Sequence, residues 1–411
     1  MTVNSAPEPA MAAGDDPRAF AAVLHAVYDA EMSGSRPPAR PREVISDSWK
    51  RVKRAGVDPE SGGTEPTLGV EQLQTRRSES RLGEVLEPVM HHLDTLIADG
   101  DNVLVVADAD GQVLWRNGRP RVLDRADRLG FTEGASWAES AVGTNAIGTA
   151  LASGRAVQVF SAEHFVRSHH TWTCAGAPIR DPRSGSVLGV VDVSGPAATI
   201  HPTTLALVDT VAKLAEAQLR DQHRARLDAL RTVAAPILAR ADGPALAVDG
   251  YGWVAAVDGV APRDRMLLPA SCAPGRVHLH GLGDCDLTPM PGGWLVRVRD
   301  AGTAERAVGI HLPSPDAVDQ SVRVSGADGA WVHRPSPRHA QILRLLAARP
   351  AGLTAADIAV ALFGDAERTV TVRAEISRLR KRFGGLLAAE PYRFADGVQV
   401  VVDGERSDRS S

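Results

Sequence analysis

One stretch in the first half of the chain, GASWAESAVGTNAIGTAL from Gly134 to Leu151, decides how that half of the sequence is interpreted. Its last third is mostly apolar and places Ala146, Ile147, Ala150 and Leu151 at the spacing of one helix face. We therefore predict a short helix with one buried side. The glycines of the stretch then permit close packing, and a phosphate cradle is the weaker interpretation.

Three further segments complete the motif. They read AEHF at 162–165, WTCAGAPI at 172–179 and LGVVDVSG at 188–195. The last segment is apolar enough for the centre of a sheet. Helical periodicity at 78–98 and at 202–233 predicts a long helix on each side of the strands. Strands bracketed by long helices predict an α+β domain of the sensor type, whose flanking helices leave the sheet.

Taken together, these motifs closely resemble the GAF sensor domain at the N-terminus of acetoin-catabolism-type bacterial transcription activators. A helix around Ser48-Trp49 fits the same pattern, so the likeness covers about 40–235. The resemblance implies a small-molecule sensor for an alcohol, aldehyde, ketone or aromatic metabolite, with flanking helices that form a homodimer. Those activators continue into an ATPase, whereas this sequence contains no Gly-x-x-x-x-Gly-Lys-[Ser/Thr] loop. We therefore expect a regulator without ATPase activity.

Aromatic and hydrogen-bonding side chains within the motif are candidates for the wall of a ligand pocket. Such pockets combine aromatic surfaces with a few polar groups. The predicted ligand-binding residues are Trp137, Asn145, His164, Trp172 and Cys174. The competing interpretation is that these side chains serve ordinary packing and turn formation.

Metal-competent atoms gather in one part of the motif, at His164, His169, His170 and Cys174. No second cysteine and no standard ligand spacing accompanies them, so we expect no metal and no cofactor. Cys174 also suggests an alternative function, a GAF-fold redox sensor or enzyme. The domain contains no resolving cysteine, and no Ser/His/Asp set or carboxylate pair stands out. We therefore expect no catalytic residue and no enzyme activity.

The segment 338–403 predicts three helices followed by a hairpin. The third helix, at about 369–383, places four apolar residues on one buried stripe: Val372, Ile376, Leu379 and Phe383. The opposite face is basic, since 368–382 contain six Arg or Lys residues and one acid, Glu375. Residues 392–394 and 398–402 are expected to pair as a hairpin that serves as a wing.

A short helix with an apolar back and a front of Arg, Thr and Ser suits the major groove of DNA. The predicted DNA-binding residues are Arg368, Thr369, Arg373, Ser377, Arg380 and Lys381. The run VTVRAEISRLR at 370–380 also resembles OmpR-type winged helix-turn-helix domains. Two alternatives stay open, a helical bundle whose charged face is merely solvated and an adaptor whose basic helix binds a partner protein.

Composition limits the remaining possibilities. The 411 residues carry 46 Lys and Arg against 50 Asp and Glu, a net charge of −4, so attraction to DNA has to be local. Three cysteines indicate a reducing compartment rather than a disulfide framework. No apolar run approaches the roughly 18–20 residues of a membrane helix, and the N-terminus does not read as a signal peptide. We expect a cytoplasmic protein without a membrane partner.

The predicted architecture is an α+β multidomain protein with a GAF-like sensor sheet and flanking helices, a β-rich middle region and a C-terminal winged helix-turn-helix. The expected ranges are disordered tails at 1–17 and 404–411, a helical segment at 18–77, the GAF-like domain with its helices at 78–235, the middle region at 236–335 and the winged helix at 336–403. The middle region is either a second sensor or a spacer. The predicted function is a one-component transcription regulator that binds a small-molecule effector and double-stranded DNA as a homodimer.

Overall fold

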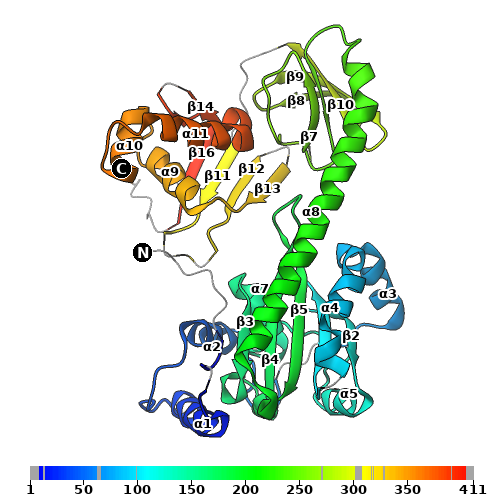
Figure 1. The fold of residues 1–411 in the computed structure, drawn as a ribbon, viewed down its shortest axis with the longest axis vertical. Helices are drawn as coiled ribbons and strands as arrows, with labels where there is room; N and C mark the ends of the chain where they lie inside the picture. Colours follow the sequence, from blue (N-terminus) through cyan, green and yellow to red (C-terminus); the bar gives the residue numbers. More distant parts are fainter. Residues whose placement is uncertain are drawn as a thin grey trace. The chain divides into compact units, whose positions relative to one another are not determined.

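The chain folds into two compact units, one formed by Met1–Asp181 and Ser186–Leu219, the other by Pro182–Gly185 and Arg220–Ser411. Figure 1 shows the elements of each unit in this computed structural model. The structure describes residues 9–12, 14–62, 66–98, 100–269, 272–300, 308–315, 317, 319–326, 329–389 and 391–403. None of the helices in these ranges is both long enough and apolar enough to cross a membrane.

A five-stranded antiparallel sheet with the order β2-β1-β5-β4-β3 forms the centre of the first unit (Figure 1). Its strands are β1 (Val103–Asp108), β2 (Val113–Gly118), β3 (Val157–Phe160), β4 (Trp172–Arg180) and β5 (Val187–Pro196). The LGVVDVSG segment lies in β5, the middle strand, which confirms the prediction of a central strand from its continuous apolar run.

Helices cover both faces of this sheet. One face packs against α5 (Pro120–Asp127) and α7 (Ala146–Ser153), and the other against α4 (Leu86–Ala98) and the first turns of α8 (Pro202–Leu238). The same unit contains α3 (Val70–Glu79) and the single-turn α6 (Glu139–Val142). The helix predicted at the end of the 134–151 stretch is confirmed as α7, in which Ala146, Ile147 and Ala150 are buried and Leu151 is half-buried.

Two N-terminal helices, α1 (Pro17–Ser33) and α2 (Glu43–Ala55), pack on the first unit. Ala10 and Met11 precede them and are buried, and the Ala10 N–H donates to Gln158 Oε1 at 3.0 Å. The expected disordered tail at 1–17 is therefore wrong for this part, because an apolar pair inserts into the core. Residues 1–8 and 404–411, also expected to be disordered, lie outside the described residues.

The second unit contains two larger sheets. The first has the order β7-β6-β10-β9-β8 and consists of β6 (Ala245–Val248), β7 (Val254–Asp258), β8 (Gly275–Leu279), β9 (Gly283–Met290) and β10 (Gly293–Asp300). The second has the order β13-β12-β11-β16 and consists of β11 (Val308–Leu312), β12 (Val322–Gly326), β13 (Gly329–His333) and β16 (Val398–Val402). The expected β-rich region at 236–335 is thus divided between two sheets.

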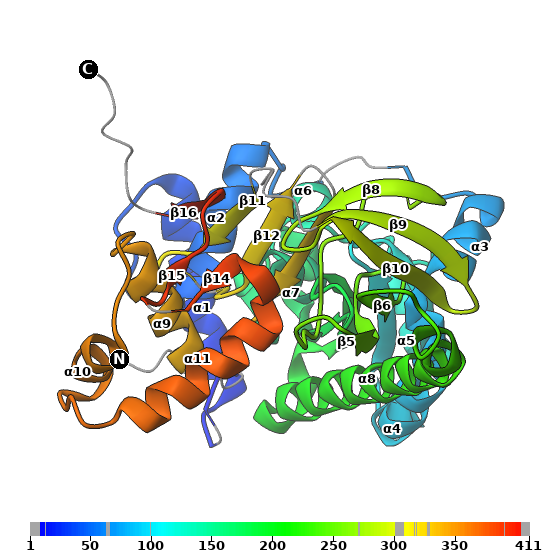
Figure 2. The same cartoon turned by 90° about the horizontal axis from the view of Figure 1, so that it is seen from above.

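Three helices, α9 (Pro337–Ala347), α10 (Ala355–Phe363) and α11 (Thr369–Phe383), share one core with the sheet of β11, β12, β13 and β16. Figure 2 shows them gathered beside that sheet. The strands of 308–333 therefore belong to the same core as the helices of 337–383. The expected domain boundary at 335 falls within this core.

The predicted hairpin after α11 is wrong. The short strand β15 (Arg393–Phe394) pairs with β14 (Leu387–Ala388), while β16 pairs in parallel with β11. The reason is the alternating apolar pattern of β16, since Val398, Val400 and Val402 pack against the core when the strand lies beside β11.

Candidate functional site

A small cavity lies beside β4 inside the first unit. It is lined by Leu129, Phe131, Trp137, His164, His169, Trp172 and Cys174. Trp172 and Cys174 are two residues apart on one strand and therefore project from the same face of the sheet. Four of the five predicted ligand-binding residues thus meet at one place. The cavity has about the volume of one water molecule, so a larger ligand requires its walls to move.

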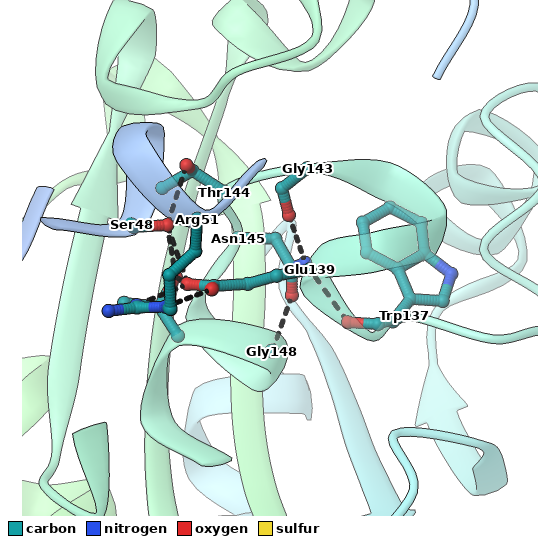
Figure 3. Close-up of polar contacts among 9 residues, drawn as sticks. Ser48, Arg51, Trp137, Glu139, Gly143, Thr144, Asn145 and Gly148 are labelled. Carbon is teal, nitrogen blue, oxygen red and sulfur yellow. Dashed lines mark hydrogen bonds and ion pairs between the residues drawn. The ribbon is translucent and has the colours of Figure 1, made fainter. Parts of the chain in front are cut away.

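Asn145, the fifth predicted ligand residue, lies outside the cavity and caps α7 (Figure 3). Its Oδ1 accepts from the Gly148 N–H at 3.0 Å, and its Nδ2 donates to the carbonyls of Gly143 at 2.8 Å and Trp137 at 3.0 Å. The amide uses both ends on backbone groups, as an N-cap does. Asn145 consequently holds the segment that carries Trp137 and does not line the cavity itself.

Aromatic rings form most of the cavity wall. The rings of Phe131 and Trp137 have centroids 3.9 Å apart, and Trp137 stacks on His169 at 5.1 Å. His164 and His169 meet edge to face at 6.1 Å. No Arg, Lys, Asp or Glu is among the lining residues within the described part of the chain. The surface offered to a ligand is therefore aromatic and uncharged.

The polar groups of the wall are neutral at physiological pH. Burial lowers the pKa of His164 to about 3 and that of His169 to about 4, and it raises the pKa of the Cys174 thiol well above its usual range. His164 Nδ1 lies 2.9 Å from the Ser161 carbonyl and donates to it, so Nε2 accepts from the Cys174 thiol at 3.4 Å. A thiolate, which the redox alternative requires, is disfavoured here.

His169 retains an unused hydrogen-bonding atom. Its Nδ1 is buried and has no hydrogen-bond partner among the described residues. Buried polar atoms are normally paired, so an unpaired one on a cavity wall is a natural contact for a bound molecule. His170 points elsewhere, because its Nε2 bonds the His164 carbonyl at 3.1 Å and its ring packs against Tyr28. No three His, Cys, Asp or Glu side chains of the described residues are placed to hold a metal ion.

One buried acid next to this cavity was not among the site residues predicted from the sequence. Asp192 on β5 is fully buried, accepts from the Ser194 hydroxyl at 2.5 Å, and has no partner for Oδ1 among the described residues. Ser194 lies opposite Cys174 in the sheet. Burial raises the pKa of Asp192 to about 7. The sequence feature that could have identified Asp192 is a single carboxylate inside the mostly apolar run LGVVDVSG.

A second polar cluster fixes α2 to the central motif (Figure 3). Glu139 accepts from the Ser48 hydroxyl at 2.5 Å, from the Thr149 hydroxyl at 2.8 Å, and from the Arg51 guanidinium at 2.7 and 2.8 Å. Thr144 Oγ1 lies 2.7 Å from the same serine oxygen. The Ser48 helix and the 134–151 stretch are therefore joined by a partly buried polar network.

The C-terminal helix α11 has the two-sided character predicted for it. Its apolar stripe is buried, while Arg373, Ser377 and Arg380 on the other side are exposed. Within the described residues the side chains of Arg373 and Ser377 have no hydrogen-bond or ion-pair partner. Both are therefore available to a ligand outside the fold.

The other predicted DNA-binding residues are more constrained. Arg368 precedes α11, lies over the Phe363 ring at 5.2 Å, and is followed by the half-buried Thr369. The Arg380 Nε donates to the Leu387 carbonyl at 3.3 Å. Lys381 Nζ lies 3.3 Å from Asp264 Oδ1, so this lysine already has an anionic partner.

Glu375, the one acid on α11, is itself neutralised. Its carboxylate contacts His339 at 2.8 Å and Arg378 at 2.6 Å. The one acid of α11 therefore adds no unpaired negative charge to the basic side of the helix.

Comparisons with known proteins show two kinds of similarity. Residues 32–221 match the family model described as MimR, N-terminal domain. The acetoin dehydrogenase operon transcriptional activator AcoR of Bacillus subtilis is 38% identical over 187 residues, which cover 45% of this chain and 31% of the activator. The propane 2-monooxygenase operon transcriptional activator MimR of Mycolicibacterium smegmatis is 30% identical over 193 residues, which cover 47% of this chain and 31% of the activator. The chain thus spans about a third of each activator.

The second similarity extends over nearly the whole chain. An uncharacterized 47.3 kDa protein in the thcA 5' region of Rhodococcus erythropolis is 30% identical over 402 residues, which cover 95% of this chain and 73% of that protein. The chain belongs to the family of this Rhodococcus erythropolis protein, and its residues 32–221 are similar to the MimR N-terminal domain.

Proposed function

We propose that the protein is a cytoplasmic, one-component transcription regulator. It senses a small molecule through a GAF-like domain in the first unit and binds double-stranded DNA through an OmpR-like winged helix-turn-helix, whose core joins the strands of 308–333 to the helices and strands of 337–402. The observation that carries the proposal is α11, a helix buried by one apolar stripe whose other side exposes Arg373, Ser377 and Arg380. The activators AcoR and MimR, similar over the first half of the chain, support a regulatory role.

The sensor function rests on the cavity beside β4. Its aromatic wall and neutral histidines suit an uncharged molecule such as an alcohol, aldehyde, ketone or aromatic metabolite. An ionised ligand would lose its hydration without gaining a counter-charge, which is costly. His169 Nδ1 supplies one hydrogen bond, and Trp137 and Trp172 supply the apolar surface.

The effector regulates DNA binding by favouring one arrangement of a homodimer over another. A ligand shifts such an equilibrium only through its different affinity for the two arrangements. The helix α8 is 37 residues long, packs on the sensor sheet with its first turns, and is the element through which we expect the two copies to associate. A dimer reads two half-sites, so the operator is expected to contain a repeat. Regulation needs no ATPase in this scheme.

Selection of genomic DNA fragments by the purified full-length protein at two salt concentrations tests the proposal. We expect enrichment of a short repeated site upstream of a metabolic operon, and an affinity that falls steeply with salt. The double variant Arg373→Ala, Arg380→Ala should lose that enrichment. The matched control is the double variant Arg54→Ala, Arg323→Ala, which removes two exposed arginines, one on α2 and one on β12. If the α11 variant bound its site as the control does, the assignment of α11 would be wrong.

Two other outcomes favour the alternatives. Salt-insensitive, unselective retention of DNA would favour an adaptor whose basic helix binds a protein. A turnover or redox response that vanished in Cys174→Ser while DNA binding persisted would favour the Cys174-dependent function.

A further inference from the structure

The segment 263–267, which follows β7, lies against the C-terminal end of α11. The Asp264 N–H donates to the Lys381 carbonyl at 2.9 Å, and Asp264 Oδ1 lies 3.3 Å from Lys381 Nζ. One residue of the middle region therefore contacts both the backbone and the side chain of one residue of the helix. The backbone contact does not depend on the charge of either side chain.

The position of Asp264 is fixed by its neighbours. Its carbonyl accepts from the Val254 N–H at 2.9 Å, and the Met266 N–H donates to Gly252 at 2.9 Å, which ties the segment to the β7 edge. Arg265 is 6% exposed, and its guanidinium lies between the rings of Trp253 and Trp331, at 5.0 and 5.1 Å. The carboxylate of Asp264 is therefore held beside α11 by packing and not by the ion pair alone.

Lys381 continues the exposed row of α11. It follows Ser377 by four residues, as Ser377 follows Arg373, so the three side chains lie on one side of the helix. A lysine at the end of such a row is in the place where a helix in the major groove meets the phosphate backbone. In this structure the anion beside that lysine is the Asp264 carboxylate.

We propose that Asp264 limits the sequence-independent affinity of the protein for DNA by competing with phosphate for Lys381. The inference rests on the proposed DNA-binding role of α11. Phosphate contacts add affinity to every DNA sequence, and each contact adds about one to the slope of log K against log salt. While Asp264 holds Lys381, that contact is not made. The middle region thereby acts on DNA binding, which neither a spacer nor an independent sensor would do.

Asp264→Asn removes the competing charge and leaves the backbone hydrogen bond in place. We expect the full-length variant to bind a random-sequence duplex more tightly than the parent, with a salt slope steeper by about one. Lys381→Gln is the reference for the double variant Asp264→Asn, Lys381→Gln, because both proteins lack the lysine. In the double variant the gain should vanish, since the residue that makes the new contact is gone.

The matched control is Asp258→Asn, which removes an exposed acid from β7 of the same sheet. Equal behaviour of Asp264→Asn and Asp258→Asn would overturn the inference, as would a gain of the double variant over Lys381→Gln as large as the gain of Asp264→Asn over the parent. Arg373→Ala separates the two claims. If it weakens binding while Asp264→Asn has no effect, only the role of Asp264 is wrong. If no variant and no parent protein binds DNA, the proposed function fails as well.

Discussion

His164 Nε2 lies 3.4 Å from the sulfur of Cys174, and this contact joins the segment before β4 to β4 itself in the wall of the cavity. Both groups are buried and neutral, so the contact is a thiol-to-imidazole hydrogen bond and not an ion pair. The polar chemistry of the candidate sensor is thus built from uncharged groups.

The Cys174 thiol should resist alkylation in the folded protein at neutral pH, because burial both raises its pKa and blocks access. Cys272, which is only partly buried, should react first. Mass spectrometry of iodoacetamide-treated protein, with a urea-unfolded sample as control, measures both sites. Rapid labelling of Cys174 in the native sample would contradict the neutral-thiol assignment and revive the redox alternative.

Asp192 should make the protein less stable as the pH rises. Its pKa is about 7 in the folded protein and about 3.9 in an unfolded chain, so the folded state binds the proton more tightly. Its contribution is fully present below about pH 4, is lost as the pH rises to about 7, and then levels off. At about 1.4 kcal/mol per pKa unit, the loss is at most about 4 kcal/mol.

Asp192→Asn isolates this effect. His164 and His169 act in the opposite direction, since their lowered pKa values cost stability as the pH falls below about 6.5. Both histidines are present in the parent and the variant, so the difference between the two proteins reports on Asp192. We expect urea unfolding to show that the free energy of unfolding of the variant, relative to that of the parent, is higher at about pH 8 than at about pH 5. A difference that does not change with pH would contradict the assignment.

The sequence predicted local features of the fold well and distant pairings poorly. The stripe of Val372, Ile376 and Leu379 follows from helical periodicity, which needs only neighbouring residues. The parallel pairing of β16 with β11 and the contact of Asp264 with Lys381 join segments far apart in the chain. No local pattern encodes such contacts.

The residue types of the motif predicted most of the side chains that line the cavity, but they did not predict the role of each side chain. Aromatic and sulfur-containing residues of the motif do line it, because large apolar side chains in the core of a domain face the same interior. Asn145 has the same hydrogen-bonding groups whether it binds a ligand or caps a helix, so composition alone did not distinguish the two roles.

Asn145→Ala should destabilise the first unit. The substitution removes the cap of α7 and leaves the buried carbonyls of Trp137 and Gly143 without their donor. We expect the free energy of unfolding to fall by roughly 2–4 kcal/mol. Urea denaturation measures this change, with the exposed Asn117→Ala on β2 as a control that should stay within about 0.5 kcal/mol. A loss no larger than that of the control would show that the amide is not a structural cap.

The cavity should discriminate between ligands by charge. None of its lining residues in the described chain carries a charge at neutral pH, so an alcohol should bind where the carboxylate of the same carbon skeleton does not. A thermal shift series of such matched pairs measures this, because a ligand that binds the folded state alone raises the unfolding temperature. The shift should disappear in Trp137→Ala, which removes a wall of the cavity, and persist in Trp115→Ala, whose ring packs with the core on the other face of the sheet. Stabilisation by the carboxylate and not by the alcohol would show that a cation outside this cavity binds the effector.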